Sequence, residues 1–239
     1  MARKTLADLK RSEPPAGRHD KSWAALGWDT SLTSVACVGS GYDAVLDKRV
    51  GPAYAELRWM PEDDYFFRLG DAAKSFDLAL SVLGDLGMPL PLERVFMAVE
   101  EPVPYGMFAK GMSGWLKQQC EVAGAVKGSL VRYGFLNLSE INNSQWHATL
   151  RTDGVEFEVI KRDWSTHAKT EAKLRNKFAI KPWAINAFGL PDLPDLVKSK
   201  SSAKIPRPES GYGAKAKAVQ PSDIYDAAAV CAWMCDNLP

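Results

Sequence analysis

Residues 25–39, ALGWDTSLTSVACVG, place an acidic residue between two apolar segments. Residues 23–29 predict a buried strand, and residues 34–40 predict its antiparallel hairpin partner. Asp29 ends the first of these strands. Its carboxylate therefore either stabilises the turn as an Asx-turn or belongs to an active site, and the rest of the chain has to decide between the two.

The composition is that of a globular protein with a sizeable apolar core. Of the 239 residues, 46% are hydrophobic and 25% are charged,. Thirty basic against 29 acidic residues give a net charge of +1, so attraction to a polyanion depends on how charge is distributed locally,.

Cysteine usage and hydropathy indicate a cytoplasmic protein. The four cysteines are scattered in apolar surroundings, which predicts reduced thiols, and no zinc-ligand spacing is present,. The N-terminal residues lack the apolar core of a secretory signal, and no apolar run is long enough for a membrane span,.

Beyond the hairpin, the pattern changes from consecutive strands to strands separated by helices. Helices are expected where apolar residues recur at spacings of three and four, and strands where short apolar runs end at turns or acids. This order predicts an α/β fold with a mixed five-stranded sheet and helices on both faces. We expect further strands at residues 52–60, 94–99 and 135–141, and helices at residues 64–83, 112–133, 161–181 and 223–238.

Acidic residues stand at the ends of three of these elements. Asp29 ends the first strand, Glu100 ends the strand at residues 94–99, and Asp223 with Asp226 opens the last helix. At about 100° per residue, Asp223 and Asp226 project roughly 60° apart, so both can face the sheet. Converging carboxylates suit two Mg²⁺ ions, which Mn²⁺ can replace, and such ions can activate a water and stabilise the departing oxygen of a phosphodiester.

Three motifs in this order resemble the RuvC-type Holliday-junction resolvases of the ribonuclease H-like superfamily, including members encoded by bacteriophages. The motifs are GWDTSLTS, MAVEEP and DIYDAAAV, and the resemblance covers roughly residues 23–141 and 221–238. It implies a ribonuclease H-like fold and a magnesium-dependent endonuclease that acts on four-way or related branched DNA. It further implies a homodimer formed through the helix at residues 112–133. The implied catalytic and metal-binding residues are Asp29, Glu100, Asp223 and Asp226.

Composition and the family resemblance together suggest how the chain is divided into segments. Residues 1–21 are polar and predict a flexible arm, and residues 22–239 are expected to form one nuclease domain,. The segment at residues 142–220 is longer than the compact pattern of the family requires, and it is expected to be an insertion. Within it, residues 198–220 hold six basic residues and one acid among Ser, Pro and Gly, which predicts a mobile basic loop,.

Basic and aromatic side chains are the candidate DNA contacts. Many family members carry an aromatic residue soon after the strand glutamate, where this chain has Tyr105 slightly later. Three lysines spaced by four predict one basic helix face, and a solvated surface is an equally good interpretation of them. The candidates are Tyr105, Lys110, Lys117, Lys169, Lys173, Lys177, Lys198, Lys200, Lys204, Lys215 and Lys217.

Structural interpretations compete with the catalytic ones. Asp223 could be the N-cap of the last helix, with Asp226 in its first turn favourable to the helix dipole, and this interpretation is compatible with a metal site. Glu100 and Glu101 could be a solvated strand end; because they point to opposite faces, at most one reaches a shared site, and the motif selects Glu100. His147 could assist proton transfer or be structural.

Three other functions compete with a junction nuclease. They are a ribonuclease H that cleaves RNA:DNA hybrids, a non-catalytic DNA-binding module and an actin-like ATPase. An ATPase of that class needs a second Asp-Gly-rich phosphate loop, which the sequence lacks. The segment at residues 106–113, GMFAKGMS, imitates the glycines of a P-loop but has Met112 in place of the required lysine,.

Overall fold

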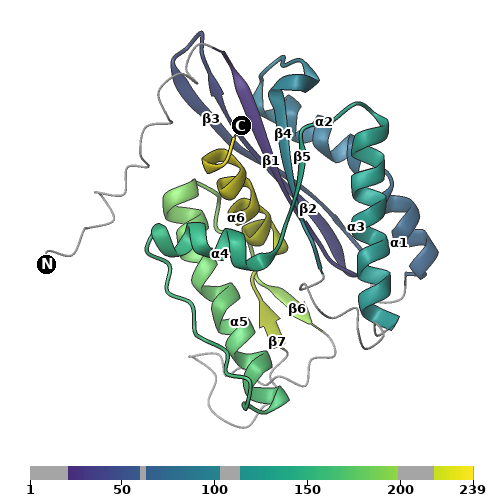
Figure 1. Cartoon of the computed structure of the whole chain (residues 1–239), viewed down its shortest axis with the longest axis vertical. Coiled ribbons are helices and arrows are strands. Elements are labelled where there is room, and N and C mark those ends of the chain that lie inside the picture. The colour runs from purple at the N-terminus through teal and green to yellow at the C-terminus, as the bar shows by residue number, and fades with distance from the viewer. Residues whose placement is uncertain (1–20, 60–62, 103–113, 199–217, 239) are drawn as a thin grey trace, which may run out of the picture.

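The computed structural model describes residues 21–59, 63–102, 114–198 and 218–238. Its centre is a five-stranded sheet in the order β3-β2-β1-β4-β5 (Figure 1). β2 pairs antiparallel with both β1 and β3, whereas β4 runs parallel to β1 and β5 runs parallel to β4. The predicted mixed sheet is therefore confirmed. The strands are β1 (Trp23–Thr30), β2 (Ser34–Asp43), β3 (Lys48–Arg58), β4 (Val95–Glu100) and β5 (Leu138–Ile141).

Helices cover both faces of this sheet (Figure 1). One face is covered by α1 (Tyr65–Ala72), α2 (Ser75–Leu86) and α3 (Gly114–Arg132). The other is covered by α6 (Asp223–Asp236), against which α4 (Asn143–Thr152) and α5 (Thr166–Trp183) pack. Shorter elements are the 3₁₀ helix η2 (Leu92–Arg94), the π-helix η4 (Ala184–Phe188) and the strand pair β6 (Leu196–Lys198) and β7 (Ala218–Gln220). None of the described helices has the length and apolar character needed to cross a membrane.

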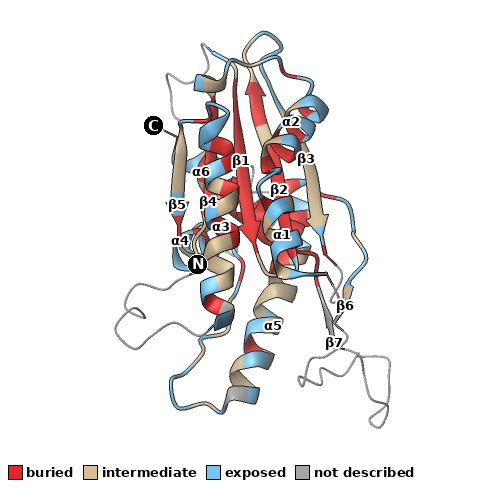
Figure 2. Ribbon diagram, turned by 90° about the vertical axis from the view of Figure 1, so that its right-hand side faces the viewer, coloured by how far each residue is buried: buried red, intermediate tan, exposed pale blue. Residues whose placement is uncertain are grey.

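The alternation of side chains along β1 divides the core into two layers. Leu26 and Trp28 pack with α2 and α3, whereas Ala25 packs with α6 on the opposite face,. Every residue of β1 is buried, as expected for a central strand (Figure 2). Asp29 follows the same alternation and therefore lies on the α6 face.

α6 lies unusually close to β1 because both elements carry very small side chains. A Cβ atom added at Gly27 would lie 2.1 Å from the backbone nitrogen of Cys231. The facing residues of α6 include Ala227 and Ala228, which are fully buried. Cys231 also donates an Sγ–H hydrogen bond to the carbonyl of Ala25, at 3.3 Å. This close approach fixes the start of α6 over the carboxyl end of β1.

Two expectations about elements were wrong or incomplete. The helix expected at residues 64–83 is broken into α1 and α2, with Lys74 at φ −94° and ψ 12° between them. The Ser75 hydroxyl donates to the Ala72 carbonyl at 2.6 Å, which satisfies a backbone acceptor at the break. The apolar spacing continues across this break, so periodicity alone could not reveal it. α4 was not expected at all.

The expected basic loop at residues 198–220 begins and ends in regular structure, because β6 and β7 pair as antiparallel strands. Its central residues, 199–217, lie outside the described residues, as does most of the expected N-terminal arm.

Candidate metal centre

Two of the predicted carboxylates lie at the same edge of the sheet. β1 and β4 are parallel, and Trp28 is aligned with Val99. The next residues along these strands are Asp29 and Glu100, so both carboxylates emerge where the two strands end. Asp29 is 8% exposed, and Glu100 is half-buried.

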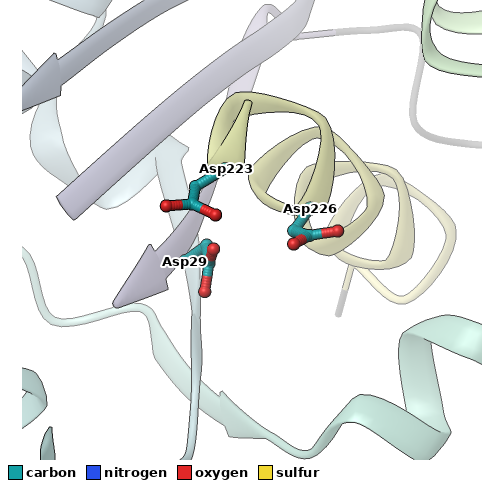
Figure 3. Close-up of side chains that lie close together, drawn as sticks. All are labelled: Asp29, Asp223 and Asp226. Atoms are coloured by element: carbon teal, nitrogen blue, oxygen red, sulfur yellow. The ribbon is translucent and has the colours of Figure 1, made fainter. Parts of the chain in front are cut away.

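The other two predicted carboxylates come from the first turn of α6. Ser222 is the N-cap of this helix, and its hydroxyl accepts a hydrogen bond from the Ile224 backbone N–H. Capping is therefore not the role of Asp223, which is buried together with Asp226. One carboxylate oxygen from each of Asp29, Asp223 and Asp226 lies within 4.8 Å of the others (Figure 3).

Burial and mutual repulsion make this cluster unfavourable when it is fully ionised. Burial raises the pKa of Asp29 well above its ordinary value, and the nearby charges of Asp223 and Glu100 raise it further,. Burial, followed by the charge of Asp226, raises the pKa of Glu100 to about 7. Such a cluster gains free energy by binding a cation, and its oxygen atoms are the ligands that magnesium prefers.

The neighbouring glutamate faces away from this cluster. Lys127, on α3, lies 3.3 Å from a carboxylate oxygen of Glu101 on the opposite side of the sheet. The structure thus brings Glu100, rather than Glu101, toward the aspartates.

Lys177, expected to contact DNA, instead contacts the acidic cluster. Its Nζ atom lies 2.8 Å from Asp223 Oδ1 and 2.5 Å from Asp226 Oδ2. Burial alone would lower the pKa of Lys177, but Asp226 and Asp223 outweigh burial and hold it well above its ordinary value. Lys177 therefore does not belong to a plain solvated face of α5, and its contact with DNA stays a prediction.

Several residues around the cluster were not predicted from the sequence. The Ser34 hydroxyl donates to Asp223 Oδ2 at 2.5 Å. Glu56, on β3, is a further carboxylate near Asp223; its pKa is raised chiefly by burial. The indole N–H of Trp146 lies near Glu100 and partly offsets the rise in the pKa of that carboxyl. Nε1 does not reach full hydrogen-bond geometry.

A signal for the position of Trp146 is present in the sequence. The Asn142 side chain accepts hydrogen bonds from the backbone N–H groups of Ser144 and Gln145, and the Asn142 backbone N–H donates to Gln145 Oε1. This capping box starts α4 directly after β5, at the edge of the sheet where the carboxylates lie. The Asn-x-x-Gln pattern at residues 142–145 could have predicted the start of that helix,.

The cluster lies in an open cleft of about 410 Å³. Trp146, His147, Lys173 and Asn176 contribute to its walls. The His147 ring stacks on Phe157 with centroids 4.1 Å apart, and burial lowers the pKa of His147 to about 4. His147 is therefore neutral near pH 7.

The remaining DNA-contact candidates are dispersed. Lys173 lines the cleft, Lys169 donates to the carbonyl of Arg162 at 2.7 Å, and Lys117 lies 3.8 Å from Glu121 on α3. Lys198 ends β6, and its side chain is not among those described. Six candidates lie outside the described residues, namely Tyr105, Lys110, Lys200, Lys204, Lys215 and Lys217.

Comparison with solved structures finds a similar fold in RuvC from Thermus thermophilus. The similarity has a TM-score of 0.50 at 12% sequence identity and covers 89% of this chain and 93% of that chain. The chain has the ribonuclease H-like fold of RuvC. This fold agrees with the mixed sheet, its strand order and the helices on both faces.

Two further structures are less similar. Thermus thermophilus RuvC in complex with a Holliday junction substrate gives a TM-score of 0.47 at 13% identity, covering 90% of this chain and 93% of that one. An Aquifex aeolicus member of the Ppx/GppA family gives a TM-score of 0.28 at 12% identity, covering 53% and 37%. No protein-family model and no curated protein matches the sequence.

Proposed function

We propose that this chain is a magnesium-dependent, structure-selective endonuclease of the crossover-junction type. One observation carries the proposal: carboxylates from β1, β4 and α6 meet in an open cleft at the carboxyl ends of two parallel strands. The RuvC-type fold and the three sequence motifs support a branched-DNA substrate, four-way junctions in particular.

The donor set fits the proposed metal ions. Asp29, Glu100 and Asp226 would hold them and Asp223 would complete the site, because all four offer the hard oxygen ligands that Mg²⁺ and Mn²⁺ take. Bound ions would activate a water and stabilise the departing oxygen of the cleaved phosphodiester. Ser34 keeps one oxygen of Asp223 fixed by donating its hydroxyl proton.

The helices of the proposed insertion build the walls of the cleft. Trp146 and His147 come from α4, and Lys173 and Asn176 come from α5. We propose that these side chains face the nucleotides next to the cleaved bond, and that Lys173 contributes positive charge there. The stacking of His147 on Phe157 supports a structural role for that ring.

The proposed partner is branched DNA, and the proposed assembly is a homodimer that acts in the cytoplasm in association with the nucleoid. Resolution of a four-way junction needs two matched nicks, and a twofold dimer supplies two sites. The basic residues at 198–220 would add charge-dependent affinity, which falls with rising salt.

Cleavage of a panel of labelled DNAs tests this function. Four-way junctions, flaps, forks, linear duplexes and RNA:DNA hybrids are incubated with the protein in Mg²⁺ or in EDTA. We expect junctions to be cut only in Mg²⁺. Asp29→Asn, Glu100→Gln and Asp226→Asn should each lower the rate by at least about 10³-fold, because an amide keeps the volume but loses metal affinity.

Glu101→Gln is the matched control, since it changes the adjacent glutamate that faces Lys127. An equal loss of cleavage in this variant would contradict the assignment of Glu100. Cleavage restricted to RNA:DNA hybrids would indicate a ribonuclease H instead. Junction binding without cleavage under any metal would indicate a non-catalytic module.

A further inference from the structure

Lys177 occupies the space between two of the proposed metal ligands. Its ammonium lies 2.8 Å from Asp223 and 2.5 Å from Asp226. A magnesium ion lies about 2.0–2.1 Å from each oxygen it binds. A divalent ion and the ammonium cannot share these oxygens at such distances without strong repulsion between the two cations.

The carboxylates of Asp223 and Asp226 are held in place by the fold, whereas the Lys177 side chain can move away from them. The side chains of Asp223 and Asp226 are 5% and 7% exposed, and both belong to the first turn of a buried helix. The Lys177 side chain is 32% exposed and lies in the wall of the open cleft. Its flexible four-carbon stem allows the ammonium to move toward the solvent.

We infer that Lys177 is an internal counter-cation that competes with the divalent metal for Asp223 and Asp226. This inference rests on the proposed metal site. Metal binding is then an exchange of one cation for another, and the ion pairs of Lys177 weaken the affinity of the site for metal. In the metal-free protein the same ion pairs hold the acidic side chains together.

Metal affinity of the full-length protein without DNA tests the exchange. Binding of Mn²⁺ is measured by isothermal titration calorimetry for wild type and for Lys177→Met, which keeps the length of the side chain but removes the charge. We expect Lys177→Met to bind Mn²⁺ about tenfold more tightly, because two charge-assisted contacts no longer have to be broken. Lys177→Arg, which keeps the charge, should retain weak binding.

Lys127→Met is the matched control, because Lys127 also contacts two glutamates, Glu101 and Glu140, but on the other side of the sheet. Its Mn²⁺ affinity should equal that of wild type. In wild type labelled with ¹⁵N-lysine, addition of Mg²⁺ should move one ammonium resonance, which is absent from Lys177→Met.

The outcomes separate this inference from the proposed function. Equal or weaker Mn²⁺ binding by folded Lys177→Met, or a lysine resonance unmoved by saturating Mg²⁺, would overturn the competition. If Asp226→Asn binds Mn²⁺ as well as wild type does, the metal site itself is wrong. If Lys177→Met is unfolded by circular dichroism, the absence of the resonance from Lys177→Arg identifies it, and its movement in wild type decides the question.

Discussion

The folded structure places a single carboxyl group, that of Glu100, where its charged form is unfavourable. Glu100 is half-buried near Asp226, and its pKa of about 7 lies above the ordinary 4.5. Between these two pH values, the folded protein binds more protons at Glu100 than the unfolded chain does. The stability contributed by this group is therefore fully present below about pH 4.5 and is lost as pH rises through about 7.

The Glu100→Gln variant should reveal, in the absence of metal, how much ionisation of Glu100 lowers the free energy of unfolding. We expect its free energy of unfolding in EDTA to exceed that of wild type by about 1–2 kcal/mol at about pH 8, because a repelled charge has been removed. The gain should shrink as the pH falls toward about 5, where wild-type Glu100 becomes protonated. Urea denaturation at several pH values measures both effects.

Glu101→Gln is the control for this measurement as well, because it removes a charge that contacts Lys127 rather than other acids. It should not increase stability at high pH. A Glu100→Gln variant less stable than wild type throughout the range would contradict the electrostatic argument.

At the scale of elements, the position of the site depends on the contact between β1 and α6. Gly27 allows this contact, since a Cβ atom there would lie 2.4 Å from the Ala227 carbonyl oxygen. Backbone atoms cannot move aside as a flexible side chain can. Any larger residue must push α6 away from the strand, and Asp223 and Asp226 would move with it.

Gly27→Ala should therefore damage stability and activity together. Overpacking of this kind lowers the free energy of unfolding by about 1–3 kcal/mol or more. We expect junction cleavage to fall at least tenfold even under conditions in which the variant stays folded. Chemical denaturation and cleavage assays measure the two effects. Gly84→Ala on α2 is the control: no atom lies within 4 Å of its added Cβ, so it should be neutral or slightly stabilising,.

Elements with strong local patterns could be predicted, and contacts between distant segments could not. The buried strand that ends at Asp29 and the strand that ends at Glu100 were predicted, and the observed sheet places these two residues at the ends of adjacent parallel strands. The break at Lys74 escaped prediction because apolar spacing continues through it. The ion pairs of Lys177 escaped prediction because they join it to Asp223, 46 positions away, and to Asp226 in the same helix, whereas helical spacing describes only neighbours on one helix.

At the scale of the whole molecule, two nicks on opposed strands require two copies of the site. We expect sedimentation to give a mass about twice the 26.3 kDa of one chain,. Junction cleavage should then produce paired nicks symmetric about the branch point. The helix at residues 112–133 remains the proposed dimer surface. It corresponds to α3, on which Val131 is 49% exposed.

A monomer that makes single nicks in flaps and forks would contradict this assembly. It would also replace the four-way junction with a broader class of branched DNA as the substrate. The acidic cluster would keep its proposed role in that case.

The contact between β1 and α6 also bears on how the protein is made. The hydrogen bond from Cys231 to Ala25 spans 206 positions, so α6 leaves the ribosome long after the strand it completes. Throughout that interval Asp29 has neither Asp223 nor Asp226 beside it, and a nascent or prematurely terminated chain carries an incomplete set of ligands. Synthesis from the N-terminus thus keeps the proposed metal site incomplete until α6 has been made.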